Sequence, residues 1–153
     1  MSCIEVEKIL VIHGPNLNML GRREEKHYSN QTLDEINKGL ISQANAHQIS
    51  IQIHQSNQES QIVDWIHQST QDKTKFLIIN PAAFGHTSIA LRDALLCLNF
   101  PFIEVHISNI YSREEFRQFS YTMDLAYGVI MGLGPNGYSL ALTHATNYVE
   151  RKQ

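Results

Sequence analysis

The sequence is poor in cysteine, in basic runs and in long apolar runs, and each shortage excludes a class of protein. Its two cysteines, Cys3 and Cys97, are too few for a disulfide scaffold and indicate a reducing compartment. No basic run exceeds Arg22-Arg23 and the net charge is -3, which argues against a nucleic-acid partner because phosphate binding needs a concentrated basic face. No apolar run approaches the roughly 20 residues that cross a bilayer.

What is present suits one folded unit. The 153 residues are 42% hydrophobic and 18% charged, which predicts a single domain, residues 1–153, with a sizeable core. Glu5 and Glu7 precede the first apolar run, so no signal peptide is expected and we predict a soluble, cytoplasmic protein. Cys97 lies between leucines and is expected to be a buried thiol.

Short apolar runs alternate with amphipathic stretches along the chain. Strands are predicted at residues 9–12, 49–53, 76–79, 102–106 and 129–131. Helices are predicted to begin at the capping boxes 32–35 and 56–59, and to span 88–98, 113–118 and 138–149, with a loop at 82–87. This alternation predicts a five-stranded parallel α/β sheet with helices on both faces, in the flavodoxin-like order 2-1-3-4-5.

A long polar loop follows the first predicted strand. Pro15 ends the strand because it cannot donate to a sheet ladder. The next dozen residues have almost no apolar periodicity and carry Asn16, Asn18, Arg22, Arg23, Glu24 and Tyr28. A polar loop of this length at the end of a buried strand is more often functional than idle.

Polar side chains follow all five predicted strands, and the carboxyl ends of parallel strands meet at one edge of a sheet. The crevice is expected where the strand order reverses, beyond strands one and three. The candidates are His13, Asn16, Arg23, Tyr28, His54, Gln55, Asn80, His86, Thr87, Ser88, Glu104, His106, Ser108, Asn109 and the glycine-rich stretch 132–137. One or two of the four histidines are expected to be structural, His54 first. The other histidines are predicted at the surface: His27, His47, His67 and His144.

Glu104 and His106 stand two apart on a predicted strand, so their side chains share one face. A carboxylate in that place can orient an imidazole that acts as a general acid. A simple buried ion pair explains the same spacing, and the sequence leaves both readings open.

Three other kinds of chemistry are disfavoured. Gly132-x-Gly134-x-x-Gly137 matches the dinucleotide fingerprint, but no further strand follows it, so a turn and helix start is the better reading. A metal site from His13, His86, His106 and Glu104 has no short-range ligand spacing and no cysteine. No lysine stands at the predicted strand ends for imine chemistry, Lys26 alone being near. What remains is acid–base chemistry by Tyr, His, Arg and Asn, without a cofactor or metal.

Several stretches, in order and over nearly the whole chain, resemble the type II 3-dehydroquinate dehydratases. They are residues 14–24, Tyr28, 55–57, 64–67, 79–88, 91–94, 104–109, 113–117 and 132–134. The resemblance implies trans-elimination of water from 3-dehydroquinate to give 3-dehydroshikimate, in the shikimate route to aromatic amino acids or in quinate breakdown. It also implies a homododecamer of four trimers and a mobile lid around Arg23 and Tyr28.

The resemblance assigns a role to each site residue by position. Tyr28, as a tyrosinate favoured by the charge of Arg23, would remove a proton from C2. Asn16 would stabilise the enolate through a water, and His106, oriented by Glu104, would protonate the leaving hydroxyl. The substrate-binding residues would be Asn80, His86 and Arg117 for the ring hydroxyls, the backbone of Ile107 and Ser108 for the carboxylate, and Asp93 for a neighbouring subunit's site.

Some positions depart from the pattern that the resemblance implies. His13 stands where Asn is common, Glu25 where Pro is usual, Ser29 where Gly is usual, and Phe84-Gly85 where Tyr-Thr is usual. These departures affect the lid and fine substrate contacts. The chemistry is expected to be unaffected, because every acid, base and substrate-binding residue that the resemblance implies is present. Two competing hypotheses are a flavodoxin-like module that binds a nucleotide or flavin without catalysis, and a hydrolase that uses a metal at the strand ends.

Overall fold

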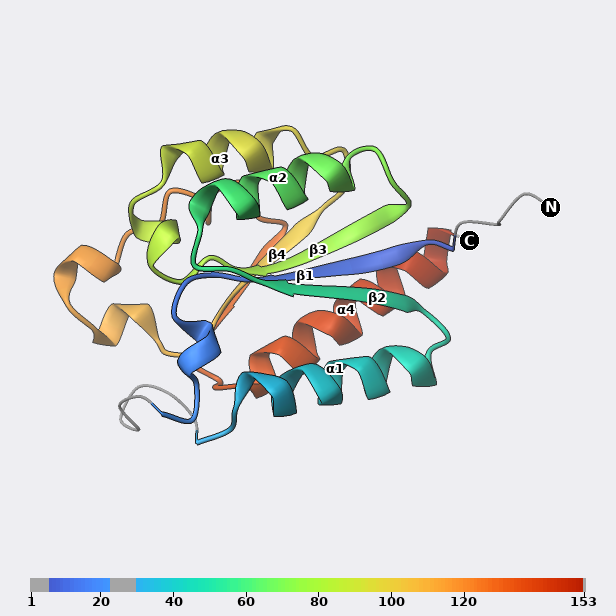
Figure 1. The fold of residues 1–153 in the computed structure, drawn as a ribbon, viewed down its shortest axis with the longest axis horizontal. Coiled ribbons are helices and arrows are strands. Elements are labelled where there is room, and N and C mark those ends of the chain that lie inside the picture. Colours follow the sequence, from blue (N-terminus) through green and yellow to red (C-terminus); the bar gives the residue numbers. More distant parts are fainter. Residues whose placement is uncertain (1–5, 23–29, 153) are drawn as a thin grey trace.

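A computed structural model describes residues 6–22 and 30–152 (Figure 1). The predictions for Cys3, Arg23, Glu24, Glu25, Lys26, His27, Tyr28 and Ser29 lie outside these residues. Five strands form one sheet: β1 (Lys8–His13), β2 (Ser50–Gln55), β3 (Thr74–Asn80), β4 (Phe102–His106) and β5 (Gly128–Met131). All four neighbouring pairs are parallel and the order is β2-β1-β3-β4-β5, which confirms the predicted sheet.

Two helices cover each face of the sheet (Figure 1). One pair is α1 (Leu33–Ala46) and α4 (Asn136–Lys152), and the other is α2 (Glu59–Ser69) and α3 (Ile89–Leu96). Strand β1 is buried on both sides because alternate residues join different cores: Ile9 and Val11 pack with α1 and α4, and Leu10 and Ile12 with α2 and α3. No helix among the described residues is long and apolar enough to cross a membrane.

The capping box at Thr32 is confirmed and the second one is wrong. The Thr32 Oγ1 accepts a hydrogen bond from the Glu35 N–H, and the Glu35 carboxylate accepts from the Thr32 N–H. Helix α2 instead begins at Glu59, after Gln58, whose side chain makes no capping bond. Ser56 stands too early in the chain, and its hydroxyl accepts from the Gln58 N–H at 2.9 Å within a turn.

Three further predictions differ from the structure. The predicted loop after β3 contains a 3-10 helix, η2 (Ala82–His86), and the predicted helix at 113–118 is reduced to a 3-10 turn, η4 (Glu115–Arg117), preceded by η3 (Ile110–Ser112). Cys97 is exposed, not buried. It is the C-cap residue of α3, and its thiol lies 3.4 Å from the Asp93 carbonyl oxygen.

The glycine-rich stretch after β5 is a turn that leads into α4, as predicted. Gly132 and Gly134 have φ values of +85° and +61°, a region that other residues rarely adopt, and α4 begins at Asn136. The turn therefore connects the edge strand to a helix that returns across the sheet.

Candidate active site

A pocket of about 90 Å³ opens at the carboxyl ends of β1, β3 and β4. Residues at the ends of these strands or just beyond them line it: Pro15, Asn16 and Leu17; Asn80, Ala82, Ala83 and His86; His106, Ile107 and Ser108. Arg117 of η4 completes the wall. The pocket includes the point between β1 and β3 where the strand order reverses, so the predicted position of the crevice is confirmed.

Asn16 enters the pocket wall from a left-handed backbone conformation. Its φ is 66°, a value that asparagine tolerates better than most residues, and it begins the 3-10 helix η1 (Leu17–Met19). The Asn57 side-chain oxygen accepts a hydrogen bond from the Asn16 N–H at 2.9 Å. This contact ties the loop after β1 to the loop after β2.

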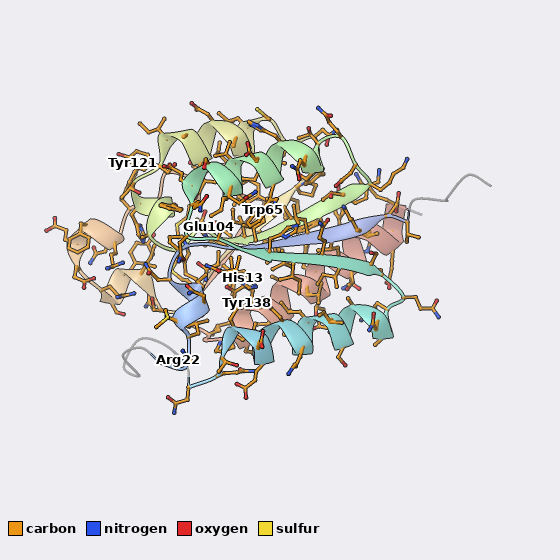
Figure 2. All side chains as sticks on the ribbon, viewed as in Figure 1. His13, Arg22, Trp65, Glu104, Tyr121 and Tyr138 are labelled. Carbon is orange, nitrogen blue, oxygen red and sulfur yellow. The ribbon has the colours of Figure 1, made fainter. Side chains whose placement is uncertain are left out.

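Glu104 and His106 form a buried pair behind the pocket. The His106 Nε2 lies 2.6 Å from the Glu104 Oε1, and the exposed fractions of the two side chains are 5% and 0%. Their strand spacing puts both on the face of β4 that Phe102 shares, which α2 and α3 cover. Glu104 is labelled in Figure 2. His106 lines the pocket and Glu104 does not, so the carboxylate can act on a ligand only through the imidazole.

Two hydroxyl groups complete the surroundings of Glu104. The Ser120 Oγ donates to Oε1 at 3.0 Å, and the Thr122 Oγ1 donates to Oε2 at 2.5 Å. With His106 this makes three donors around one fully buried carboxylate, the arrangement that an ionised, acceptor-only group needs away from water. Because Nε2 then donates to Glu104, the Nδ1 of His106 is the nitrogen left for a ligand.

Sequence reasoning missed Ser120 and Thr122. They stand in an irregular segment before β5, and the only signal was their spacing of two, which places two hydroxyls on one side of an extended chain. That spacing does not predict that the two hydroxyls bind Glu104.

His86 lies beside His106, with ring centroids 6.0 Å apart. Its Nδ1 donates to the Phe119 carbonyl at 2.7 Å, which leaves Nε2 as an acceptor. Partial burial lowers the pKa of His86, the Phe119 carbonyl opposes this, and the charges of His106 and Arg117 lower the pKa further. The imidazole is therefore neutral near pH 7.

Arg117 brings a positive charge to the pocket. The Glu114 carboxylate accepts from its Nε at 2.7 Å, and its guanidinium lies 5.3 Å from the Phe116 ring centroid. These contacts use Nε and one face of the guanidinium. Arg117 also lines the pocket, so its two terminal nitrogens can bind a polar ligand there.

Several other predicted residues that the structure describes lie outside the pocket. His54 stacks on Trp65, with ring centroids 4.4 Å apart, and His13 is fully buried beneath the sheet with Tyr138 (Figure 2). Asp93 is exposed on α3. The surface prediction is confirmed for His47, His67 and His144. Residues 6–22 and 30–152 contain no group of three or more His, Cys, Asp or Glu side chains placed to hold a metal ion.

Comparison with known proteins identifies the family. A family model described as "Dehydroquinase class II" matches residues 7–146. The chain belongs to the class II dehydroquinase family. The 3-dehydroquinate dehydratase of Chromobacterium violaceum is 57% identical over 143 residues, which are 94% of this chain and 92% of that protein. The resemblance in the sequence motifs, and with it the prediction of an enzyme, is confirmed.

Solved structures of class II dehydroquinases share the fold. The type II dehydroquinase from Propionibacterium acnes has a TM-score of 0.88 and 44% identity, with 92% of this chain and 97% of that chain covered. The one from Butyrivibrio crossotus has a TM-score of 0.89 and 40% identity, with 93% and 98% covered. The sheet and the helix layers are therefore those of the class II dehydroquinases.

Acidification is expected to destabilise this class II dehydroquinase through His13. Burial lowers the pKa of its imidazole to about 4, while the hydrogen bond to Asn37 opposes the shift. An unfolded histidine has a pKa near 6.5, so between these values the unfolded chain binds a proton that the folded chain does not. The free energy of unfolding therefore falls as the pH drops from about 6.5 towards 4. Between pH 7 and pH 5 the loss should be about 2 kcal/mol.

Urea unfolding at both pH values measures this loss in the wild type and in His13→Asn. All other titrating groups are common to the two proteins, so the difference between the two losses isolates His13. Equal losses in the two proteins would contradict the prediction.

Proposed function

We propose that this chain is a cofactor-free 3-dehydroquinate dehydratase that eliminates water from 3-dehydroquinate to give 3-dehydroshikimate, in the shikimate route to aromatic amino acids. The observation that carries the proposal is the buried Glu104–His106 pair that ends in a polar pocket. Family membership supports it independently, as does the name of the Chromobacterium relative. The catalytic unit is the single domain of residues 1–153.

The reaction divides into two proton transfers. Tyr28, which lies outside the described residues, removes the proton from C2 as a tyrosinate, with Arg23 favouring its ionised form. The electron pair passes to the carbonyl oxygen as an enolate, which Asn16 stabilises through a water. The enolate then collapses, the C–O bond of the leaving hydroxyl breaks, and His106 supplies the proton that turns this hydroxyl into water. Each positioned transfer contributes about 10²–10⁴ in rate.

Glu104 serves the acid as its orienting partner. It fixes the imidazole ring, since its Oε1 lies 2.6 Å from Nε2. Ser120 and Thr122 hold the carboxylate in that orientation. An acid with an orienting partner thus explains two observations: Glu104 is fully buried, and His106 lines the pocket.

The remaining pocket residues suit a polyhydroxylated acid. Asn80, the Nε2 of His86 and Arg117 can bind ring hydroxyls, and the backbone at Ile107 and Ser108 can bind the carboxylate. Asp93 is exposed on α3 outside its own pocket, which supports a role in a neighbouring subunit's site. The exposed rings of Phe116 and Phe119 offer apolar surface for such contacts, and we propose a homododecamer of four trimers.

Ultraviolet absorbance on mixing the purified protein with 3-dehydroquinate tests the proposal, because the product is a conjugated enone and the substrate is not. The absorbance should rise with the wild type, and a chelator or borohydride should leave the rate unchanged. Tyr28→Phe should abolish most of the rise. The absence of a rise with well-folded wild-type protein would overturn the proposed function, and loss of activity in chelator would favour a metal-dependent reaction instead.

A further inference from the structure

A chain of buried hydrogen bonds begins at the pocket residue Asn80, and its other members have no role in the reaction proposed above. The Asn80 Nδ2 lies 2.9 Å from the Tyr138 hydroxyl, and this hydroxyl lies 3.0 Å from the His13 Nδ1. The His13 Nε2 in turn lies 2.8 Å from the Asn37 Oδ1. The chain thus runs from a pocket residue on β3, through α4 and β1, to helix α1. Its two central members, His13 and Tyr138, are labelled in Figure 2.

The direction of every hydrogen bond in this chain follows from one backbone group. The Ala82 N–H lies 3.1 Å from the Asn80 Oδ1, and a backbone N–H can only donate, so that atom is the amide oxygen and Nδ2 must face Tyr138. The Tyr138 oxygen therefore accepts, and its own hydrogen goes to the His13 Nδ1. That nitrogen then carries no proton, so Nε2 carries it and donates to Asn37.

Burial keeps this direction in place. Tyr138 and His13 have exposed fractions of 0%, so no water competes for their polar atoms. Burial lowers the pKa of His13 to about 4, so the ring is neutral near pH 7 and Nδ1 can accept. Burial also raises the pKa of the Tyr138 phenol, which therefore keeps the proton that it donates. A reversed chain would leave a buried hydroxyl without an acceptor, at a cost in stability.

We propose that His13 and Tyr138 are positioning residues of this enzyme: they hold the Asn80 amide in one orientation, so that its second N–H and the free lone pair of its oxygen face the pocket. Neither residue lines the pocket, so both act through Asn80, which does. The consequence for substrate binding rests on the proposed function. The hydrogen-bond direction does not.

Kinetics of Tyr138→Phe test the consequence for binding, with Tyr148→Phe as the matched control on the same helix. Tyr148 packs its ring on Phe76 at the other end of α4, and no hydrogen bond of its hydroxyl is present among the described contacts. Tyr138→Phe should raise KM for 3-dehydroquinate about fivefold to tenfold, the size of one lost hydrogen bond, with kcat within about twofold. A merely structural role would lower the active fraction and hence kcat, with KM unchanged.

His13 is tested by a pair of substitutions. His13→Leu removes both ring nitrogens and should raise KM by a similar factor. His13→Asn keeps an acceptor oxygen and a donor amide and should restore most of the wild-type KM. A KM within about twofold of the wild type in folded Tyr138→Phe and His13→Leu would overturn the proposed positioning.

A neutron crystal structure of the deuterated wild type tests the direction independently of activity. The expected map places one deuterium on the His13 Nε2 and none on its Nδ1, and a deuterium on the Tyr138 oxygen that points to His13. Deuterium on Nδ1 would overturn the proposal whatever the kinetics. If the wild type did not convert 3-dehydroquinate, the proposed function would fail, and this map would still decide the orientation of Asn80.

Discussion

Replacing His106 by alanine is expected to lower kcat for 3-dehydroquinate about 10³-fold, while KM changes by less than about tenfold. The leaving hydroxyl departs as hydroxide unless a proton reaches it, and His106 is the group that joins the buried carboxylate to the pocket. The substitution removes the acid and leaves Asn80, His86 and Arg117 in place to bind the substrate. Steady-state ultraviolet kinetics measure both constants.

Two further variants control this result. His144→Ala removes an exposed imidazole from α4 and should keep kcat within about twofold. Glu104→Gln keeps the size of the side chain but places an amide among three donors, so it should lower kcat while the protein remains folded. A kcat near the wild-type value in folded His106→Ala would remove His106 from the role of acid.

Replacing Gly14 by alanine is expected to lower the free energy of unfolding by about 3 kcal/mol. The added Cβ would lie 2.5 Å from the Pro81 oxygen, 2.7 Å from the Pro81 carbonyl carbon and 3.0 Å from the Asn80 oxygen. All three are backbone atoms, and the Gly14 N–H donates to the same Asn80 oxygen at 2.8 Å, so the clash cannot be relieved by turning a side chain. The ends of β1 and β3 would be forced apart at the pocket.

Gly39→Ala is the matched control for this substitution. Gly39 is an exposed residue within α1, and no atom lies within 4 Å of the position that its Cβ would take. Alanine there should raise the free energy of unfolding by about 0.5–1 kcal/mol, because glycine loses more backbone freedom in a helix. Urea unfolding of both variants measures the contrast, and a Gly14→Ala protein as stable as the wild type would contradict the predicted clash.

Local patterns were enough to predict the layers of the fold. Runs such as residues 9–12 and 76–79 are apolar throughout because both of their faces are covered, which is the mark of a parallel sheet between helices. The capping box at Thr32 was predicted because its two members, Thr32 and Glu35, are only three residues apart in the sequence. The same rule failed at Ser56, since which residue begins a helix depends on the path of the chain after β2, and this path is not local.

By itself the sequence determined the sheet, its crevice and the juxtaposition of Glu104 with His106, since each of these depends on strand order or on a spacing of two. Only the tertiary structure separated the histidines into pocket residues and buried hydrogen-bonding residues. His13 stands on the face of β1 that α1 and α4 cover, so it meets Tyr138, 125 residues away along the chain. Ser120 and Thr122 reach Glu104 across 16 and 18 residues. Contacts at such separations depend on how the layers pack, which no short-range pattern encodes.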